Sequence, residues 1–212
     1  MLVFMFVLLP LALLLFFTYS KERKFQPVFF IGVISATLLC VCKALFVFAH
    51  RVVPNSFSDN YFYFLLHESL LPQVILFGLY FLIAKDDYKF KLKSYFPLLC
   101  SFYALYLPYC IISSNESEVY SGFCIFVKPV IFLAMLVQCA LMISCFVSDG
   151  KLKILKRIIA VFFIIIYLFL PALIETLYVM NYMPVLMIVL SGVYSLFPAA
   201  LCVLKFIYNL KK

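Results

Sequence analysis

Seven apolar runs divide this chain, and each is long enough to cross a lipid bilayer as a helix. Crossing the hydrocarbon core takes about 20 mostly apolar residues in helical conformation. The seven runs cover residues 1–19, 27–50, 61–84, 95–112, 122–147, 158–180 and 185–208. Because 67% of the 212 residues are hydrophobic and 12% are charged, hardly any sequence remains for a water-soluble core. We therefore predict an all-α, multi-pass integral membrane protein that folds as a single transmembrane domain over residues 1–212.

The short segments between these runs alternate in charge. Every second segment is basic, and the others carry Asp59, Glu116 and Glu118, with Arg51 as their base. The basic set comprises Lys21, Arg23, Lys24, Lys85, Lys89, Lys91, Lys93, Lys151, Lys153, Lys156, Arg157, Lys205, Lys211 and Lys212. Because basic loops stay on the cytoplasmic side, we predict seven transmembrane helices with the N-terminus outside and the C-terminus in the cytoplasm. The net charge of +8 then reflects orientation in a cytoplasmic or plasma membrane, and we expect no nucleic-acid partner.

The first run has one alternative interpretation, since a short apolar run near an N-terminus also occurs in signal peptides. Here the basic cluster follows the run, and no small-residue cleavage motif is visible, so we expect a retained span. The eight cysteines all fall within apolar runs, where cysteine acts as a small hydrophobic residue. Their spacing matches neither a zinc site nor a disulfide framework, and no phosphate-binding loop occurs. We expect neither a metal nor a cofactor.

Four charged side chains lie inside the apolar runs. They are Lys43, Glu68, Lys128 and Glu175, and His67 adjoins Glu68. A charge at the centre of a membrane helix costs roughly 2.5–3.5 kcal/mol, so such groups usually face a partner or a wet cavity. Counted from the predicted outer boundary, each lies about 9–11 Å deep. Either they form structural ion pairs or lysines that reach up to the headgroups, or they line a polar cavity near the outer face.

Helical spacing places further polar residues beside these charges. Lys128 shares a face with Gln138, and Lys43 shares one with His50. In the sixth run a proline, a carboxylate and three phenols recur on one stripe that ends near Tyr182. We predict that Lys43 or Lys128 pairs with Glu68 or Glu175 across neighbouring helices. The full predicted polar cluster consists of Lys43, His50, Glu68, Gln138, Glu175, Asn181 and Tyr182.

Prolines follow two of the embedded charges. Pro72 comes four residues after Glu68, and Pro129 directly follows Lys128. Proline inside a helix leaves a backbone carbonyl without its usual donor, which a polar neighbour or water must then satisfy. These positions therefore favour a polar site over a purely apolar interface.

Three short motifs resemble a known family. They are Leu65-Leu66-His67-Glu68-Ser69-Leu70 in the third run, Ala104-Leu105-Tyr106-Leu107-Pro108 in the fourth, and Glu175 followed by Asn181-Tyr182-Met183 at the end of the sixth. In order and spacing they are similar to the L-P-L-H-L-C, A-L-L-T-P and N-x5-N-Y-M elements of the YwaF-like bacterial integral membrane proteins and their eukaryotic acyltransferase relatives. The resemblance covers most of the chain and implies a divergent member of that family.

What the resemblance implies is transfer of acyl chains between phospholipids, with the cysteine of the H-x-C element as nucleophile. Here His67 matches the histidine, but Ser69 stands at the cysteine position, and Lys128 lies near the family's second histidine. A serine needs an adjacent base, and His67 and Ser69 are two residues apart, on different sides of a helix. A Ser69–Lys128 pair with the lysine as base is conceivable. The catalytic candidates are His67, Ser69 and Lys128.

Three classes of function remain open from the residues. The chain is a lipid-modifying enzyme, a small-solute transporter or substrate-binding membrane subunit, or a structural or receptor-like protein. In the second case Lys43 and Lys128 engage an anionic group, and Glu68 and Glu175 engage a cation or a proton. Only five glycines and no clear internal repeat argue against a repeat-built transporter. We expect membrane lipids as the first partners, with a lipid or a small anionic molecule as substrate.

Overall fold

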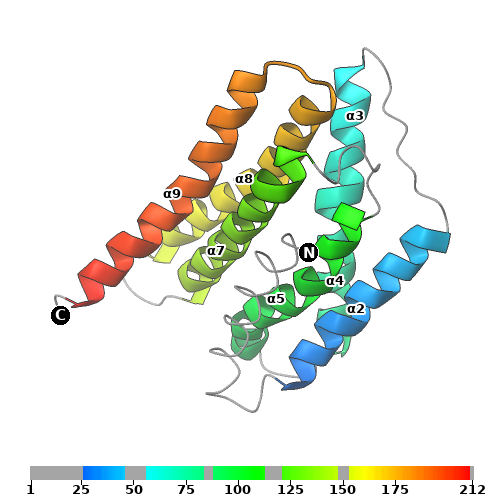
Figure 1. The fold of residues 1–212 in the computed structure, drawn as a ribbon. Helices are drawn as coiled ribbons and strands as arrows, with labels where there is room; N and C mark the ends of the chain where they lie inside the picture. Colours follow the sequence, from blue (N-terminus) through cyan, green and yellow to red (C-terminus); the bar gives the residue numbers. More distant parts are fainter. Residues whose placement is uncertain (1–25, 46–55, 84–87, 113–120, 148–152, 211–212) are drawn as a thin grey trace. The chain divides into compact units, whose positions relative to one another are not determined.

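The structure is a computed structural model, and it describes residues 26–45, 56–83, 88–112, 121–147 and 153–210 (Figure 1). These residues form helices and short connections, and no strand occurs among them. The helices, with η for the π-helices, are α2 (Gln26–Leu45), α3 (Phe57–Tyr63), η2 (Phe64–Leu70), α4 (Leu71–Ile83), α5 (Tyr88–Ile112), η3 (Phe123–Val127), α7 (Lys128–Val147), α8 (Lys153–Val179) and α9 (Pro184–Leu210). The predicted all-α class is confirmed for this part of the chain.

Five stretches of helix are long and apolar enough to cross a membrane. They run over Pro27–Leu45, Phe57–Leu82, Phe123–Ile143, Ile154–Val179 and Pro184–Leu201. These stretches coincide with five of the seven predicted spans and indicate a membrane location. The predicted span at 95–112 lies in α5, which is not one of the five, and the span at 1–19 lies outside the described residues. Seven spans and their orientation therefore stay predictions.

Several helices begin earlier than their apolar runs. The third predicted span began at residue 61, but α3 begins at Phe57 because Ser56 caps it: the hydroxyl oxygen accepts the backbone N–H of Asp59 at 3.4 Å. Likewise α5 begins at Tyr88 rather than 95, and α8 begins at Lys153 rather than 158. Hydropathy marks where apolar side chains begin, whereas backbone hydrogen bonding continues through the polar flanks. The sequence pattern therefore placed these helix starts too late.

The end of α8 is a Schellman motif. Asn181 has a positive φ of 49°, its N–H donates to the Tyr178 carbonyl at 3.0 Å, and the Tyr182 N–H donates to the Leu177 carbonyl at 3.0 Å. Asparagine tolerates this left-handed conformation better than most residues. Pro184 then starts α9, because its fixed φ suits the first helical position. These bonds explain why the sixth and seventh predicted spans are separated by a very short turn.

The chain divides into two compact units. The first contains residues 1–50 and 72–129, and the second contains residues 51–71 and 130–212. In the first unit α2 packs along α5, and side-chain hydrogen bonds join α4 to α5. In the second unit α8 packs against α3, η2 and α9. Each unit is described below by itself.

Helix α5 is the buried centre of the first unit. Six consecutive residues, 98–103, are each at most 1% exposed, and six residues make more than one full turn. The helix is therefore enclosed on every side at this level. Helix α2 comes closest at Gly32, where an added Cβ would lie 2.7 Å from the Leu98 carbonyl oxygen and would overlap the Ser101 hydroxyl. Gly32 is the residue that permits this crossing.

Candidate functional site

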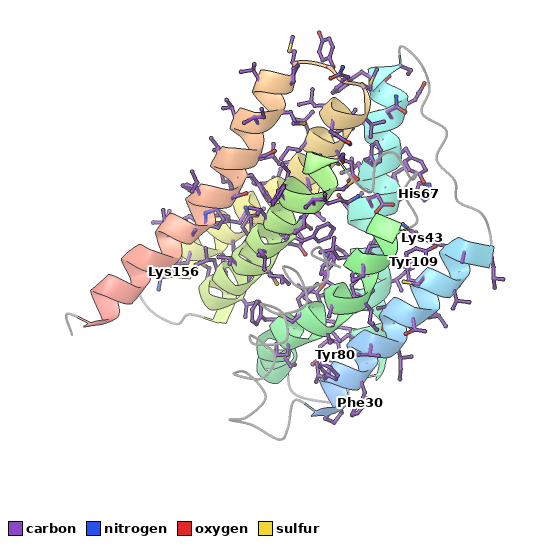
Figure 2. All side chains as sticks on the ribbon, viewed as in Figure 1. Phe30, Lys43, His67, Tyr80, Tyr109 and Lys156 are labelled. Atoms are coloured by element: carbon purple, nitrogen blue, oxygen red, sulfur yellow. The ribbon has the colours of Figure 1, made fainter. Side chains whose placement is uncertain are left out.

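The clearest polar contact inside the apolar helices joins Lys43 to Tyr106. Lys43 (labelled in Figure 2) lies in the last turn of α2 and is 9% exposed. It follows Ala36 and Leu39 on the buried face of that helix, which packs on α5. Its Nζ donates a hydrogen bond of 2.6 Å to the hydroxyl of the fully buried Tyr106, and lies 5.1 Å from the ring centroid. The short distance to the oxygen places the ammonium at the hydroxyl end of the ring.

A second polar group joins α4 to α5. The Nε2 of Gln73 donates to the Tyr103 hydroxyl at 2.6 Å, and the Tyr95 hydroxyl donates to Oε1 of Gln73 at 3.0 Å. Farther along the same pair of helices, the hydroxyls of Tyr80 and Ser94 are hydrogen-bonded to each other. All these side chains except Tyr95 are buried. Phenols of α5 thus bond to side chains of both α2 and α4.

The contact of Lys43 with Tyr106 and the contact of Gln73 with Tyr103 differ in their energetic cost inside a membrane. Hydrogen bonds between membrane helices contribute about 0.6 kcal/mol on average, so neutral pairs such as Gln73–Tyr103 are adequate to hold helices together. A lysine at membrane depth costs roughly 2.5–3.5 kcal/mol, and a hydrogen bond to a charged group contributes about 1.5–3 kcal/mol, so the bond to Tyr106 offsets much of that cost. Lys43 is therefore a more costly helix contact than the neutral Gln73, and an anionic group near its ammonium would stabilise the charge further.

The embedded lysines and the embedded glutamates belong to different units. The bases Lys43 and Lys128 belong to the first unit, and the acids Glu68 and Glu175 belong to the second. Lys128 is buried at the first position of α7, whereas both glutamates are half-buried. A pair between one of these lysines and one of these glutamates stays a prediction.

The proposed catalytic residues His67 and Ser69 lie in η2. The imidazole of His67 stacks on the ring of Tyr63, with centroids 4.6 Å apart and an interplanar angle of 26°. Ser69 is 3% exposed, and within the described residues its hydroxyl makes no hydrogen bond to a base. Since this segment is a π-helix, the angle between the two side chains differs from the α-helical value that the sequence suggested. Their catalytic role stays a prediction.

The remaining predicted residues lie in unlike environments. Gln138 is 1% exposed in α7, and its Oε1 accepts no hydrogen bond from any described residue. Asn181 and Tyr182 are exposed in the turn after α8, where the Tyr182 ring meets Phe57 edge-on at 6.4 Å. His50 lies outside the described residues. The structure thus joins Lys43 to a phenol, and the predicted cluster as a whole stays a prediction.

Sequence reasoning missed the phenols of α5 and their partner Gln73. A signal for them exists in the sequence: Tyr103 and Tyr106 are three residues apart in the middle of an apolar run. Tyrosines of membrane helices concentrate at the interfaces, so phenols far from a run's ends need polar partners inside the protein. Their spacing alone did not reveal which helices would supply those partners.

Comparison of the chain with protein-family models, with curated proteins and with solved structures finds no match. The resemblance to the YwaF-like family therefore stays a prediction that depends on the three short motifs.

Proposed function

We propose that this chain is a multi-pass protein of the cytoplasmic or plasma membrane that binds the anionic group of a lipid or a small solute inside its helices. The observation that carries the proposal is the buried ammonium of Lys43 beside the Tyr106 hydroxyl. Binding, whether for transport or for presentation of a substrate, requires no further chemistry from the chain. Membrane lipids are its first expected partners.

The hydrogen-bonding capacity of the group around Lys43 supports an anionic ligand. Lysine has three donors and no acceptor, so the Tyr106 oxygen must accept and its own proton is directed elsewhere. Tyr103 likewise accepts from Gln73, which directs its proton onward. The rings of Tyr103 and Tyr106 lie 6.2 Å apart on the same helix. An ammonium held beside phenol hydroxyls inside apolar helices suits the oxygens of a carboxylate or a phosphate, which accept charge-assisted hydrogen bonds.

The test compares binding by wild type and by Lys43→Met in nanodiscs. Phosphatidylcholine nanodiscs would be doped with phosphatidylglycerol or oleate, and retained lipid would be counted by native mass spectrometry. Since hydrogen bonds to charged groups contribute about 1.5–3 kcal/mol, we expect Lys43→Met to weaken retention at least about tenfold. Lys156→Met, which removes a lysine near the start of α8, is the matched control and should retain lipid normally.

A soluble competitor separates the two sources of the anionic group. Inorganic phosphate and acetate would be added to the same nanodiscs, and their displacement of lipid would indicate a solute site rather than a headgroup site. Retention by a folded Lys43→Met variant equal to that of wild type would contradict the proposal.

Acyl transfer is the second candidate, and the observation that favours it is the π-helix that carries His67 and Ser69. Lipid profiles of cells with and without the chain test it, together with Ser69→Ala and Ser69→Cys. If Ser69 is the nucleophile, Ser69→Ala abolishes a chain-dependent change in acyl distribution, and Ser69→Cys preserves part of it. An acyl distribution that does not respond to the chain would argue against this candidate.

A further inference from the structure

Two helices of this chain contain the same backbone irregularity. The π-helix η2 ends at Leu70 and is followed by one residue and then Pro72. The π-helix η3 ends at Val127 and is likewise followed by one residue and then Pro129. The sequence indicated the prolines, but only the structure shows the π-helix before each of them.

Each irregularity weakens the helix at one point. The Leu71 N–H donates to the Leu66 carbonyl, and the Lys128 N–H donates to the Phe123 carbonyl, both five residues back. The following residue is a proline, which has no N–H to donate. A widened turn is therefore followed directly by a missing hydrogen bond. Kinks and bends of helices occur at both kinds of feature, and here the two coincide.

Proline alone does not produce this arrangement in the described residues. Pro97 and Pro108 in α5, Pro171 in α8 and Pro198 in α9 all lie within α-helical segments. These four prolines lack a preceding π-helix and serve as internal controls.

The two irregularities also fall at two of the three boundaries between the compact units, and the third boundary, between residues 50 and 51, lies outside the described residues. One of these two boundaries lies between Leu71 and Pro72, and the other lies between Pro129 and Val130. The chain is helical through both boundaries, from Phe57 to Ile83 and from Phe123 to Val147. A continuous α-helix resists bending, so two units that such helices connect move only if each helix has a flexible point.

We propose that Leu71–Pro72 and Lys128–Pro129 are hinges about which the two units move relative to each other. The hinges carry residues predicted as functional, because His67 and Ser69 lie in η2 and Lys128 precedes Pro129. Motion at the hinges is thus coupled to the surroundings of these side chains. The proposal does not depend on what the chain binds.

Distance measurements between the units test the hinges. Spin labels on unnatural amino acids, which leave the cysteines intact, would replace the exposed residues Leu38 in α2 and Val193 in α9. A second pair, Leu38 and the exposed Leu105 of α5, lies within the first unit and reports intact folding. In nanodiscs we expect a broad or two-peaked distance distribution for the first pair and a narrow one for the second.

Pro72→Ala and Pro129→Ala restore a backbone donor and should narrow the distribution between units. Pro171→Ala, in a helix without a π-segment, should leave it unchanged. A wild-type distribution as narrow as that of the pair within the first unit would overturn the proposal, as would an unchanged distribution in both hinge variants.

If the alanine variants do not fold, hydrogen exchange of the wild-type protein tests the hinges instead. Backbone amides of η2 and η3 should exchange about fivefold faster than those around Pro171, a factor comparable to one lost hydrogen bond. Equal exchange in the three regions would overturn the proposal.

Discussion

Buried polar side chains of the two units make different contacts. In the first unit Lys43 bonds from α2 to Tyr106 on α5 and Gln73 bonds from α4 to Tyr103, whereas Ser101 bonds to the Leu98 carbonyl of its own helix. In the second unit the buried hydroxyl of Thr176 bonds to the Ala172 carbonyl of its own helix at 2.7 Å. In that unit η2 packs against α8, and Phe64, Leu65 and Ala172 form a buried apolar cluster there.

This difference has a physical cause. In a bilayer, apolar side chains gain little by leaving lipid for protein, so close packing and interhelical hydrogen bonds must hold helices together. The first unit has both, since Gly32 lets α2 approach α5 and phenols bridge the helices. Both units leave large apolar residues exposed, such as Ile34 of α2 in the first and Val185 and Ile188 of α9 in the second, as suits a lipid-facing surface. Substitutions should therefore affect the two units unequally.

The largest loss of stability is expected for Gly32→Ala. Its Cβ would lie 2.7 Å from the Leu98 carbonyl oxygen, and backbone atoms cannot move aside as a flexible side chain can. Overpacking of this kind lowers the free energy of unfolding by about 1–3 kcal/mol, and we expect a clash with backbone atoms to cost close to the larger value. Unfolding by SDS in mixed micelles, followed by circular dichroism, measures the change. Gly78→Ala in α4 is the control, because no atom lies within 4 Å of its Cβ.

The next largest effect is expected for Tyr106→Phe. It removes the acceptor of the Lys43 ammonium, a hydrogen bond to a charged group, and should cost about 2 kcal/mol of unfolding free energy. The double variant Lys43→Met/Tyr106→Phe replaces both polar partners and should be more stable than Tyr106→Phe alone. If the two substitutions instead reduced stability additively in the same SDS titration, the pair would not be coupled.

A smaller effect is expected for Gln73→Leu. It removes both hydrogen bonds of the amide, to Tyr103 and Tyr95, and at about 0.6 kcal/mol each it should cost about 1 kcal/mol. Val74→Leu changes the exposed neighbouring residue and should stay within about 0.5 kcal/mol of wild type. Equal unfolding midpoints for the two variants would show that Gln73 does not join α4 to α5 energetically.

The smallest effect is expected for Thr176→Val in the second unit. Its hydroxyl bonds within its own helix, where such bonds contribute little, so the change should stay within about 0.5 kcal/mol. Ser191→Ala, whose hydroxyl bonds to the Met187 carbonyl of α9, should behave alike in the same titration. If Thr176→Val lowered the free energy of unfolding as much as Tyr106→Phe does, the hydrogen bonds within and between helices would not differ in strength as we expect.

Much of the fold was predictable because hydropathy is a property of local sequence. Five predicted spans coincide with long apolar helices, since runs of about 20 apolar residues suffice to define them. The start of α3 was missed by four residues, as its cap at Ser56 lies in a polar segment. The π-helices were not predicted either. Their backbone hydrogen bonds span five residues instead of the four of an α-helix, and hydropathy does not record that difference.

The candidate site was predictable in part. Lys43 stood out as a charge in an apolar run, which depends on residue type alone. The pairing of Lys43 or Lys128 with a glutamate stays a prediction, and the contact that the structure shows for Lys43 is to Tyr106. Asn181 appeared as part of a polar cluster, and its conformation is accounted for by the helix end that it forms.

The sequence by itself determined the five long apolar helices of the described residues, which indicate a membrane location, and the charged residues inside apolar runs. Both properties follow from composition and order along the chain, because lipid selects long apolar helices wherever they occur. The tertiary structure decided that α5 is the enclosed helix, that Lys43 meets a phenol, and that π-helices precede two prolines at two of the boundaries between units. These features depend on which helices pack together and on the exact hydrogen-bond register, and no pattern within a single helix encodes either.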